Sequence, residues 1–258
     1  MTASPYSQIL MQAGSRHTPT VWQLAPFFAQ SKSNGTGYQP GTDIYVWPPT
    51  TTQKTILMTA PDNPPRLNTL VPPGQSLSKE HEHELLDGSG ISREFMAARG
   101  YYTATRRSEV PEVFPEWQRR LGLVVPLHSP DGKTVGYQLK PKKPRSKGPR
   151  YETPAGSRNV LDLNPLMLSA LRNTAVPLWI TEGAKKVDAL ASWGRCAIGL
   201  SGVWNWLLKG GDPLPCWRHV PLQGRRVYIA FDSDWRTNPS VQRALARLVA
   251  FLEGQGAT

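Results

Sequence analysis

Three short apolar segments in the second half of the chain place the strongest constraint on its fold. VPLWIT (176–181), RCAIGLSG (195–202) and RRVYIAFDSD (225–234) each have the length and composition of a buried strand. Segments with helical character separate and follow them: AKKVDALASW (184–193), the short VWNWLL (203–208) and PSVQRALARLVAFLEGQG (239–256). This alternation predicts an α/β domain over residues 171–258, with a Rossmann-like parallel sheet flanked by helices.

Residues 76–170 show a different pattern, which predicts a smaller α+β subdomain. A short helix after Ser78, a break at Gly88 and a second helix over 92–99 come first. A β-hairpin follows at GLVVPLHSPDGKTVGYQLKP (122–141), with its turn at 129–132. His81 and His83 are two positions apart on the first helix and face different directions, so we interpret them as solvated histidines and not as a metal pair.

Residues 1–75 are rich in Pro, Thr, Ser, Gln and Asn and predict a largely disordered tail or linker. Two pieces with aromatic residues, TVWQLAPFFAQ (20–30) and YQPGTDIYVW (38–47), are also compatible with docking strands or a short helix.

The charge balance favours a polyanionic partner. Lys and Arg outnumber Asp and Glu by 30 to 19, which gives a formal net charge of +11. Nucleic acid is the usual partner of such a chain, and a merely solvated basic surface is the alternative. The two cysteines, Cys196 and Cys216, lack zinc-site spacing and imply no disulfide framework. No run of 18 apolar residues occurs, so the expected location is the cytoplasm.

Carboxylates follow two of the three apolar strands. Glu182 comes directly after the first strand, and Asp232 and Asp234 end the third. Ligands of open α/β sheets bind at the carboxyl ends of the strands, and hard oxygen donors suit Mg²⁺ or Mn²⁺. Glu182, Asp232 and Asp234 are therefore the candidate metal ligands and catalytic residues; helix-end and turn roles are the alternative.

A basic, proline-broken loop follows the hairpin and is a candidate nucleic-acid contact. Its charged members are Lys140, Lys142, Lys143, Arg145, Lys147 and Arg150. Tyr137 and Tyr151 flank the loop and are candidates for base stacking. Lys185 and Lys186, at the start of the 184–193 helix, could contact phosphate oxygens or be ordinary solvated lysines.

The turn after the second apolar strand is another candidate phosphate contact. Small side chains at Ser201 and Gly202 would let the backbone approach a phosphate, and an ordinary tight turn is the slightly favoured alternative. Trp235 adjoins Asp234 and is the tryptophan expected nearest the site.

These motifs resemble a known family. ITEGAKKVDAL (180–190), AIGLSG (197–202) and VYIAFDSD (227–234) resemble the Toprim domain of bacterial-type primases, type IA and type II topoisomerases and some nucleases. SGIS (89–92), RGY (99–101) and GLVVPLHSPDGKTVGYQLKPKKPRSKGPRYETPAG (122–156) resemble the segment that precedes Toprim in primases, most closely in plasmid and phage replication proteins. Topoisomerases lack that segment.

The resemblance implies a DNA primase-like nucleotidyltransferase. In such an enzyme Asp232 and Asp234 would hold Mg²⁺ or Mn²⁺ against a nucleoside triphosphate, and Glu182 would be a ligand or general base. Single-stranded DNA and nucleoside triphosphates are the implied partners, with a replicative helicase as a further one. A Toprim nuclease and a non-catalytic module that binds single-stranded nucleic acid are the alternatives.

The sequence also departs from the family pattern. It contains neither the Cys and His zinc ribbon of cellular primases nor a helicase P-loop. It stops where the last Toprim strand is expected, so we expect a fragment or a truncated form.

Overall fold

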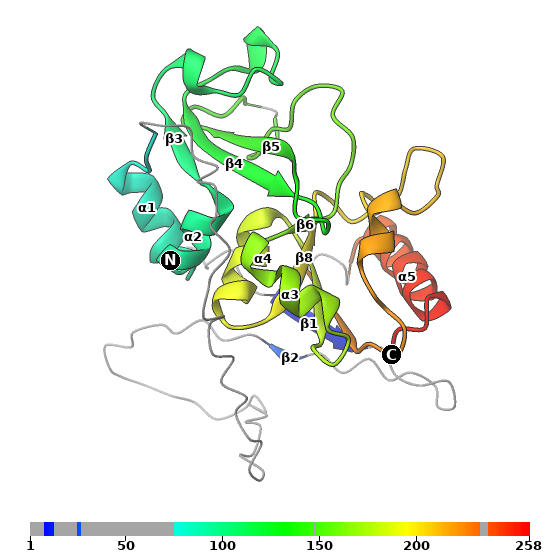
Figure 1. Cartoon of the computed structure of the whole chain (residues 1–258). Coiled ribbons are helices and arrows are strands. Elements are labelled where there is room, and N and C mark those ends of the chain that lie inside the picture. Colours follow the sequence, from blue (N-terminus) through cyan, green and yellow to red (C-terminus); the bar gives the residue numbers. More distant parts are fainter. Residues whose placement is uncertain (1–7, 13–24, 27–74, 147, 233–236) are drawn as a thin grey trace, which may run out of the picture.

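The computed structural model describes residues 8–12, 25–26, 75–146, 148–232 and 237–258 (Figure 1). Its larger sheet has the strand order β2-β1-β9-β7-β8-β6. The three strands expected from the sequence lie side by side and parallel at its centre: β7 (Leu178–Glu182), β8 (Cys196–Leu200) and β9 (Val227–Asp232). The mixed α/β architecture predicted for residues 171–258 is therefore present.

Antiparallel strands complete both sides of this sheet. β6 (Asp162–Leu163) pairs with β8, while β1 (Gln8–Gln12) pairs with β9 and carries β2 (Ala25–Pro26) on its outer side. β1 and β2 belong to the segment interpreted as a tail, and β2 falls within 20–30. The rest of residues 1–74, including 38–47, lies outside the described residues.

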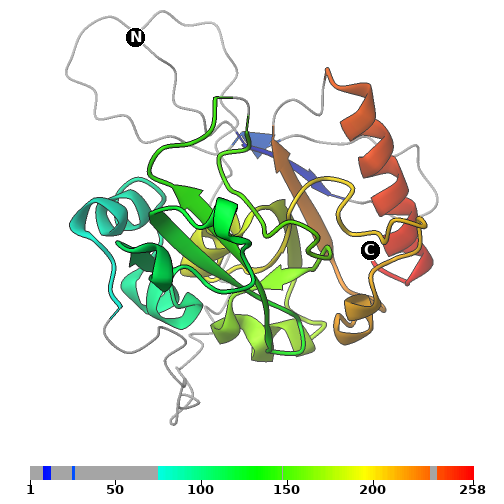
Figure 2. The same cartoon turned by 90° about the horizontal axis from the view of Figure 1, so that it is seen from above.

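Helices cover both faces of the sheet. Successive strand residues point to opposite sides, so each face presents its own apolar residues for a helix to cover. Val187 and Leu190 of α4 (Ala184–Ser192) pack with Trp179 of β7, whereas Leu245 and Leu248 of α5 (Pro239–Gly254) pack with the strand residues of the main core cluster: Leu178, Ile180, Cys196, Ile198, Leu200, Val227, Ile229 and Phe231. Shorter helical elements surround this core: η3 (Pro165–Met167), α3 (Leu168–Arg172) and η4 (Pro215–His219). Seen from above, α5 lies on the far side of the sheet from α1 and α2 (Figure 2).

The prediction of a helix over 203–208 is wrong. Leu207 forms a β-bridge with Pro213, the amide of Leu208 donates to Asp212 O at 2.8 Å, and the amide of Leu214 donates to Trp206 O at 3.0 Å. The backbone groups are thus used to close a loop instead of a helical turn. Trp206 of this segment is buried in the core.

The smaller, three-stranded sheet is built on the predicted hairpin. β4 (Gly122–His128) and β5 (Thr134–Pro141) pair antiparallel, and β3 (Tyr102–Ala104) joins the outer side of β4. Leu123 and Val125 pack toward α1 (Lys79–Leu86) and α2 (Arg93–Arg99), and Val124 packs on the opposite face with Phe114. Both predicted helices are present, and the Ser78 side chain caps the first by accepting from the His81 amide. Two 3₁₀ turns, η1 (Arg107–Glu109) and η2 (Glu116–Gln118), lie between β3 and β4.

The two histidines of α1 have different environments. His81 is buried, and burial lowers its pKa. Its Nδ1 lies 2.8 Å from Thr103 Oγ1, so the prediction of a solvated histidine is wrong here. His83 is exposed and pairs with Asp87.

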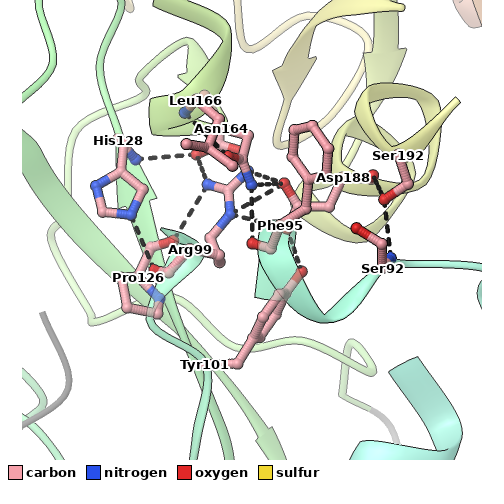
Figure 3. A network of polar contacts seen from close by, with 11 residues as sticks. Ser92, Phe95, Arg99, Tyr101, Pro126, His128, Asn164, Leu166, Asp188 and Ser192 are labelled. Atoms are coloured by element: carbon pink, nitrogen blue, oxygen red, sulfur yellow. Dashed lines mark hydrogen bonds and ion pairs between the residues drawn. The ribbon is translucent and has the colours of Figure 1, made fainter. Parts of the chain in front are cut away.

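A buried ionic network joins α2 and β4 to α4 and β6 (Figure 3). Arg99 of α2 donates to Asp188 of α4, with NH2 2.7 Å from Oδ1, and to Asp162 of β6, with NH1 2.5 Å from Oδ1. Tyr101 Oη donates to Asp188 Oδ2 at 2.7 Å, and the His128 amide donates to Asp162 Oδ1 at 2.9 Å. Burial raises the pKa of Asp162 and, together with the charge of Arg99, lowers the pKa of His128. The network fixes the position of α4, which directly follows the carboxyl end of β7.

Among the residues described, no helix combines the length and the apolar character needed to cross a bilayer.

Candidate active site

Glu182 and Asp232 lie together at the carboxyl ends of neighbouring parallel strands. Glu182 ends β7, Asp232 ends β9, and the amide of Asp232 donates to Glu182 Oε1 at 3.4 Å. Thr181 Oγ1 donates to Ala230 O at 2.8 Å, which holds the two strands in register just before the carboxylates. Glu182 is half-buried, whereas the Asp232 side chain is 54% exposed. The pair therefore has one anchored and one solvent-accessible carboxylate.

This donor set fits a divalent cation of the hard type. Two carboxylates at an open sheet edge match the sparse coordination that proteins give Mg²⁺, which keeps several of its waters. Asp234 and Trp235 lie outside the described residues, and within the described ranges no three His, Cys, Asp or Glu side chains gather closely enough to hold a metal. The three-carboxylate site thus stays a prediction, of which two members are shown to be neighbours.

Lys186 accompanies the acidic pair. It lies in the first turn of α4, directly after the Gly183 turn, and its ammonium group forms an ion pair with Asp232 Oδ1. The sequence left open whether Lys186 is a solvated helix lysine; its side chain is only 18% exposed and faces the carboxylates. A cation bound by Asp232 would compete with this ammonium group and free it for a phosphate oxygen.

A second cluster surrounds Glu84 of α1, which the sequence did not single out. Lys185 Nζ lies 2.8 Å from Glu84 Oε1, Arg150 NH2 lies 3.6 Å from the same oxygen, and Lys140 Nζ pairs with Oε2. Burial alone would raise the pKa of Glu84, but hydrogen bonds from Lys140 and Lys185 outweigh it and lower the pKa to about 2. One carboxylate thus holds together three of the predicted phosphate-binding side chains, and positive charge remains in excess.

The acidic pair and the Glu84 cluster are adjacent. Lys185 and Lys186 are consecutive in α4, and the first reaches Glu84 while the second reaches Asp232. Two consecutive residues at the start of α4 therefore link the Glu84 cluster to the Glu182 and Asp232 carboxylates. Carboxylates that can hold a cation, next to fixed cations that can hold phosphate, form an arrangement suited to phosphoryl chemistry.

The remaining members of the basic loop are exposed. Lys142 and Lys143 have exposed side chains, and Arg145 lies over the ring of Trp117 with Cζ 4.7 Å from the ring centroid. Lys147 lies outside the described residues. Tyr137 and Tyr151 are each partly buried against a hydrophobic cluster, so the exposed aromatic ring beside this loop is that of Trp117, which the sequence interpretation missed.

Ser201 and Gly202 form a turn stabilised by its own hydrogen bonds. Asn205 Nδ2 donates to Ser201 Oγ at 3.0 Å, and the Asn205 amide donates to Gly202 O at 2.8 Å. These bonds explain a tight turn without a ligand, and phosphate binding there stays a prediction.

Comparison with known proteins found a family model that matches part of the chain. Residues 168–258 match the model described as "Domain of unknown function (DUF3854)". An uncharacterized protein of Picosynechococcus sp. is 35% identical over 100 residues, a match that covers 34% of this chain and 10% of that protein. The matched segment thus spans about a tenth of the length of this relative.

Two solved structures with a similar arrangement are primases. The Aquifex aeolicus primase (zinc-binding and RNA polymerase domains) is 16% identical, with a TM-score of 0.47 over 70% of this chain and 48% of that one. The primase fragment of the bacteriophage T7 primase-helicase protein is 15% identical, with a TM-score of 0.36 over 70% of this chain and 66% of that one.

Proposed function

We propose that the chain is a metal-dependent, primase-like nucleotidyltransferase of mobile-element replication that acts on single-stranded DNA. The observation that carries the proposal is the neighbouring position of the Glu182 and Asp232 carboxylates and the basic cluster around Glu84, with Lys185 and Lys186 between them. The resemblance of 180–190, 197–202 and 227–234 to Toprim, and of 122–156 to the segment before it in primases, supports the choice of reaction.

In this proposal Glu182, Asp232 and Asp234 hold Mg²⁺ or Mn²⁺. When bound, the cation neutralises charge on the reacting phosphoryl group and orients the attacking 3′-hydroxyl. Lys186, released from Asp232, contacts a phosphate oxygen, and Lys185, Lys140 and Arg150 bind the rest of the triphosphate or the strand backbone. In this proposal the carboxylates bind the metal, and the basic side chains bind the nucleotide or the strand.

The proposed partners follow from the same assignments. Single-stranded DNA and nucleoside triphosphates are the proposed substrates, and a replicative helicase is a further partner on the basis of the resemblance alone. The cytoplasm is the proposed compartment, which agrees with the unpaired thiols of Cys196 and Cys216.

The decisive experiment is primer synthesis on a single-stranded DNA template with labelled nucleotides and Mg²⁺ or Mn²⁺. We expect metal-dependent products from the full chain and a loss of at least about 100-fold in Asp232→Ala plus Asp234→Ala, because the proposed catalysis depends on carboxylate-held charge. Glu253→Ala, which removes an exposed carboxylate from α5, is the matched control and should retain activity.

Other outcomes would assign the site differently. Metal-dependent cleavage of the template without synthesis would make the chain a Toprim nuclease. Tight DNA binding with neither activity would reduce it to a binding module, and synthesis that survives the double substitution would show that these carboxylates are not catalytic.

A further inference from the structure

Trp117 is an exposed aromatic residue in the 3₁₀ turn η2, whose neighbouring residues are buried or hydrogen-bonded. The residue is 59% exposed, although Phe114 before it is fully buried and Gln118 after it is 6% exposed. Gln118 Nε2 donates to Thr153 O at 3.1 Å, and its Oε1 accepts from the Ala155 amide at 2.8 Å. Both flanks of η2 are therefore fixed, and the exposure of Trp117 is a property of the folded scaffold and not of a loose loop.

The basic loop is fastened beside this tryptophan. The Lys142 amide donates to Leu121 O at 2.8 Å, and Arg120 NH1 donates to Lys143 O at 3.0 Å. Arg120 also pairs with Glu152, whose amide and carbonyl groups both bond to Leu139 of β5 at 2.8 Å. The start and end of the loop are thus tied to the segment that carries Trp117.

The loop beside the ring carries mainly positive charge. Arg145 lies over the ring, and in the part of the chain that the structure describes Lys142 and Lys143 form no ion pair. Glu152 is shared by Arg120 and, at 3.8 Å, Arg145; Glu112 and Glu116 are the exposed acids of the same segment. An exposed indole ring with an arginine over it, next to a loop that carries two exposed lysines, differs from the core of a protein–protein interface, where charged residues are depleted. It matches a single-stranded nucleic-acid surface, in which bases stack on aromatic rings and cations follow the backbone.

We propose that Trp117 and Arg145 form a stacking platform for an unpaired base of single-stranded DNA, with Lys142 and Lys143 on the adjacent phosphates. The inference deepens the proposed function and rests on it, because the strand held here would be the template. The indole ring is the sequence-tolerant contact, since every base offers a π-face. The platform would sit on the upstream subdomain and guide the strand toward the sheet edge without touching the reacting atoms.

The test compares two probes with the same backbone charge. A fluorescein-labelled oligo-dT and an abasic oligomer of equal length are titrated with the full chain and with Trp117→Ala, Trp117→Phe and Trp193→Ala, using fluorescence anisotropy. Trp193 is the matched control because the residue is 56% exposed and it lies at the end of α4 opposite Lys185. Thermal unfolding of each variant confirms the fold, and a substitution at an exposed ring should leave it nearly unchanged.

We expect Trp117→Ala to weaken oligo-dT binding about 10-fold and to leave abasic binding within about 2-fold, because one base stack is lost and no charge changes. Trp117→Phe should recover most of the affinity, and Trp193→Ala should match the wild type. Equal losses on both probes, or no loss on oligo-dT, would overturn the platform while leaving the proposed primase function in place.

Two further results separate the platform from the proposed function. If the wild type bound neither probe, the platform and the single-stranded DNA substrate would both be wrong. If Trp117→Ala bound DNA like the wild type but lost affinity for another protein, the ring would belong to a protein interface and the platform would be overturned.

Discussion

At the scale of single residues, Glu84 has two opposing effects on the site. It pairs with Lys140, Lys185 and Arg150, and if these cations bind phosphate as proposed, it competes with the phosphate group for them. We expect Glu84→Gln to bind inorganic triphosphate about 5-fold more tightly, because removal of one competing charge near partly exposed cations changes the binding free energy by roughly 1 kcal/mol. Isothermal titration measures this, with Glu80→Gln on the same helix as the control; unchanged or weaker binding would contradict a phosphate site.

The same carboxylate should leave a signature in the pH dependence of stability. The pKa of Glu84 is about 2 in the folded chain, below its ordinary value of 4.5, so its stabilising effect is complete above pH 4.5 and is lost as the pH falls toward 2. The difference in unfolding free energy between the wild type and Glu84→Gln should shrink over this range. A difference that stays constant from pH 5 to pH 2 would show that Glu84 is not ion-paired in solution.

The sequence predicted the residues that local pattern can reveal. Glu182 and Asp232 follow apolar strands directly, so their position at one sheet edge follows from parallel pairing. Glu84 meets Lys185 across 101 positions, and Trp117 meets Arg145 only after the basic loop folds back. An acid in an exposed-looking helix and a tryptophan in a proline-rich segment carry no local signal of such partners.

At the scale of elements, the Arg99 network determines how α2 and α4 are joined. Arg99→Ala leaves Asp162 and Asp188 buried without their cation, which typically costs about 3–5 kcal/mol of unfolding free energy. Arg93→Ala on the same helix is the control, because its side chain is 68% exposed and its ion pair with Glu82 is worth at most about 1 kcal/mol. Urea unfolding followed by circular dichroism distinguishes them, and equal midpoints would mean that the network adds no stability.

Elements with a clear period were predictable, and those fixed by loop closure were not. The hairpin and the central strands have runs of apolar residues bounded by turn signals, and all of them formed. The segment 203–208 has apolar residues without capping signals, and its backbone closes a bridge between Leu207 and Pro213. The pairing of β1 with β9 joins positions far apart in the chain, and composition indicated no strand at residues 8–12.

At the scale of the whole molecule, the net charge of +11 attracts any polyanion, but only cations in contact with phosphates release counterions. Two double variants separate the location of charge from its total amount: Lys142→Ala plus Lys143→Ala, and Lys133→Ala plus Lys209→Ala. Each lowers the net charge by two. We expect the first pair to reduce the slope of log K against log salt for oligo-dT by about 1.4, at roughly 0.7 for each single-strand phosphate contact. The second pair should leave the slope unchanged, since Lys133 lies in the hairpin turn and Lys209 lies in the loop closed by the Leu207–Pro213 bridge. Equal reductions in both variants would mean that the strand responds to overall charge and has no fixed path along the basic loop.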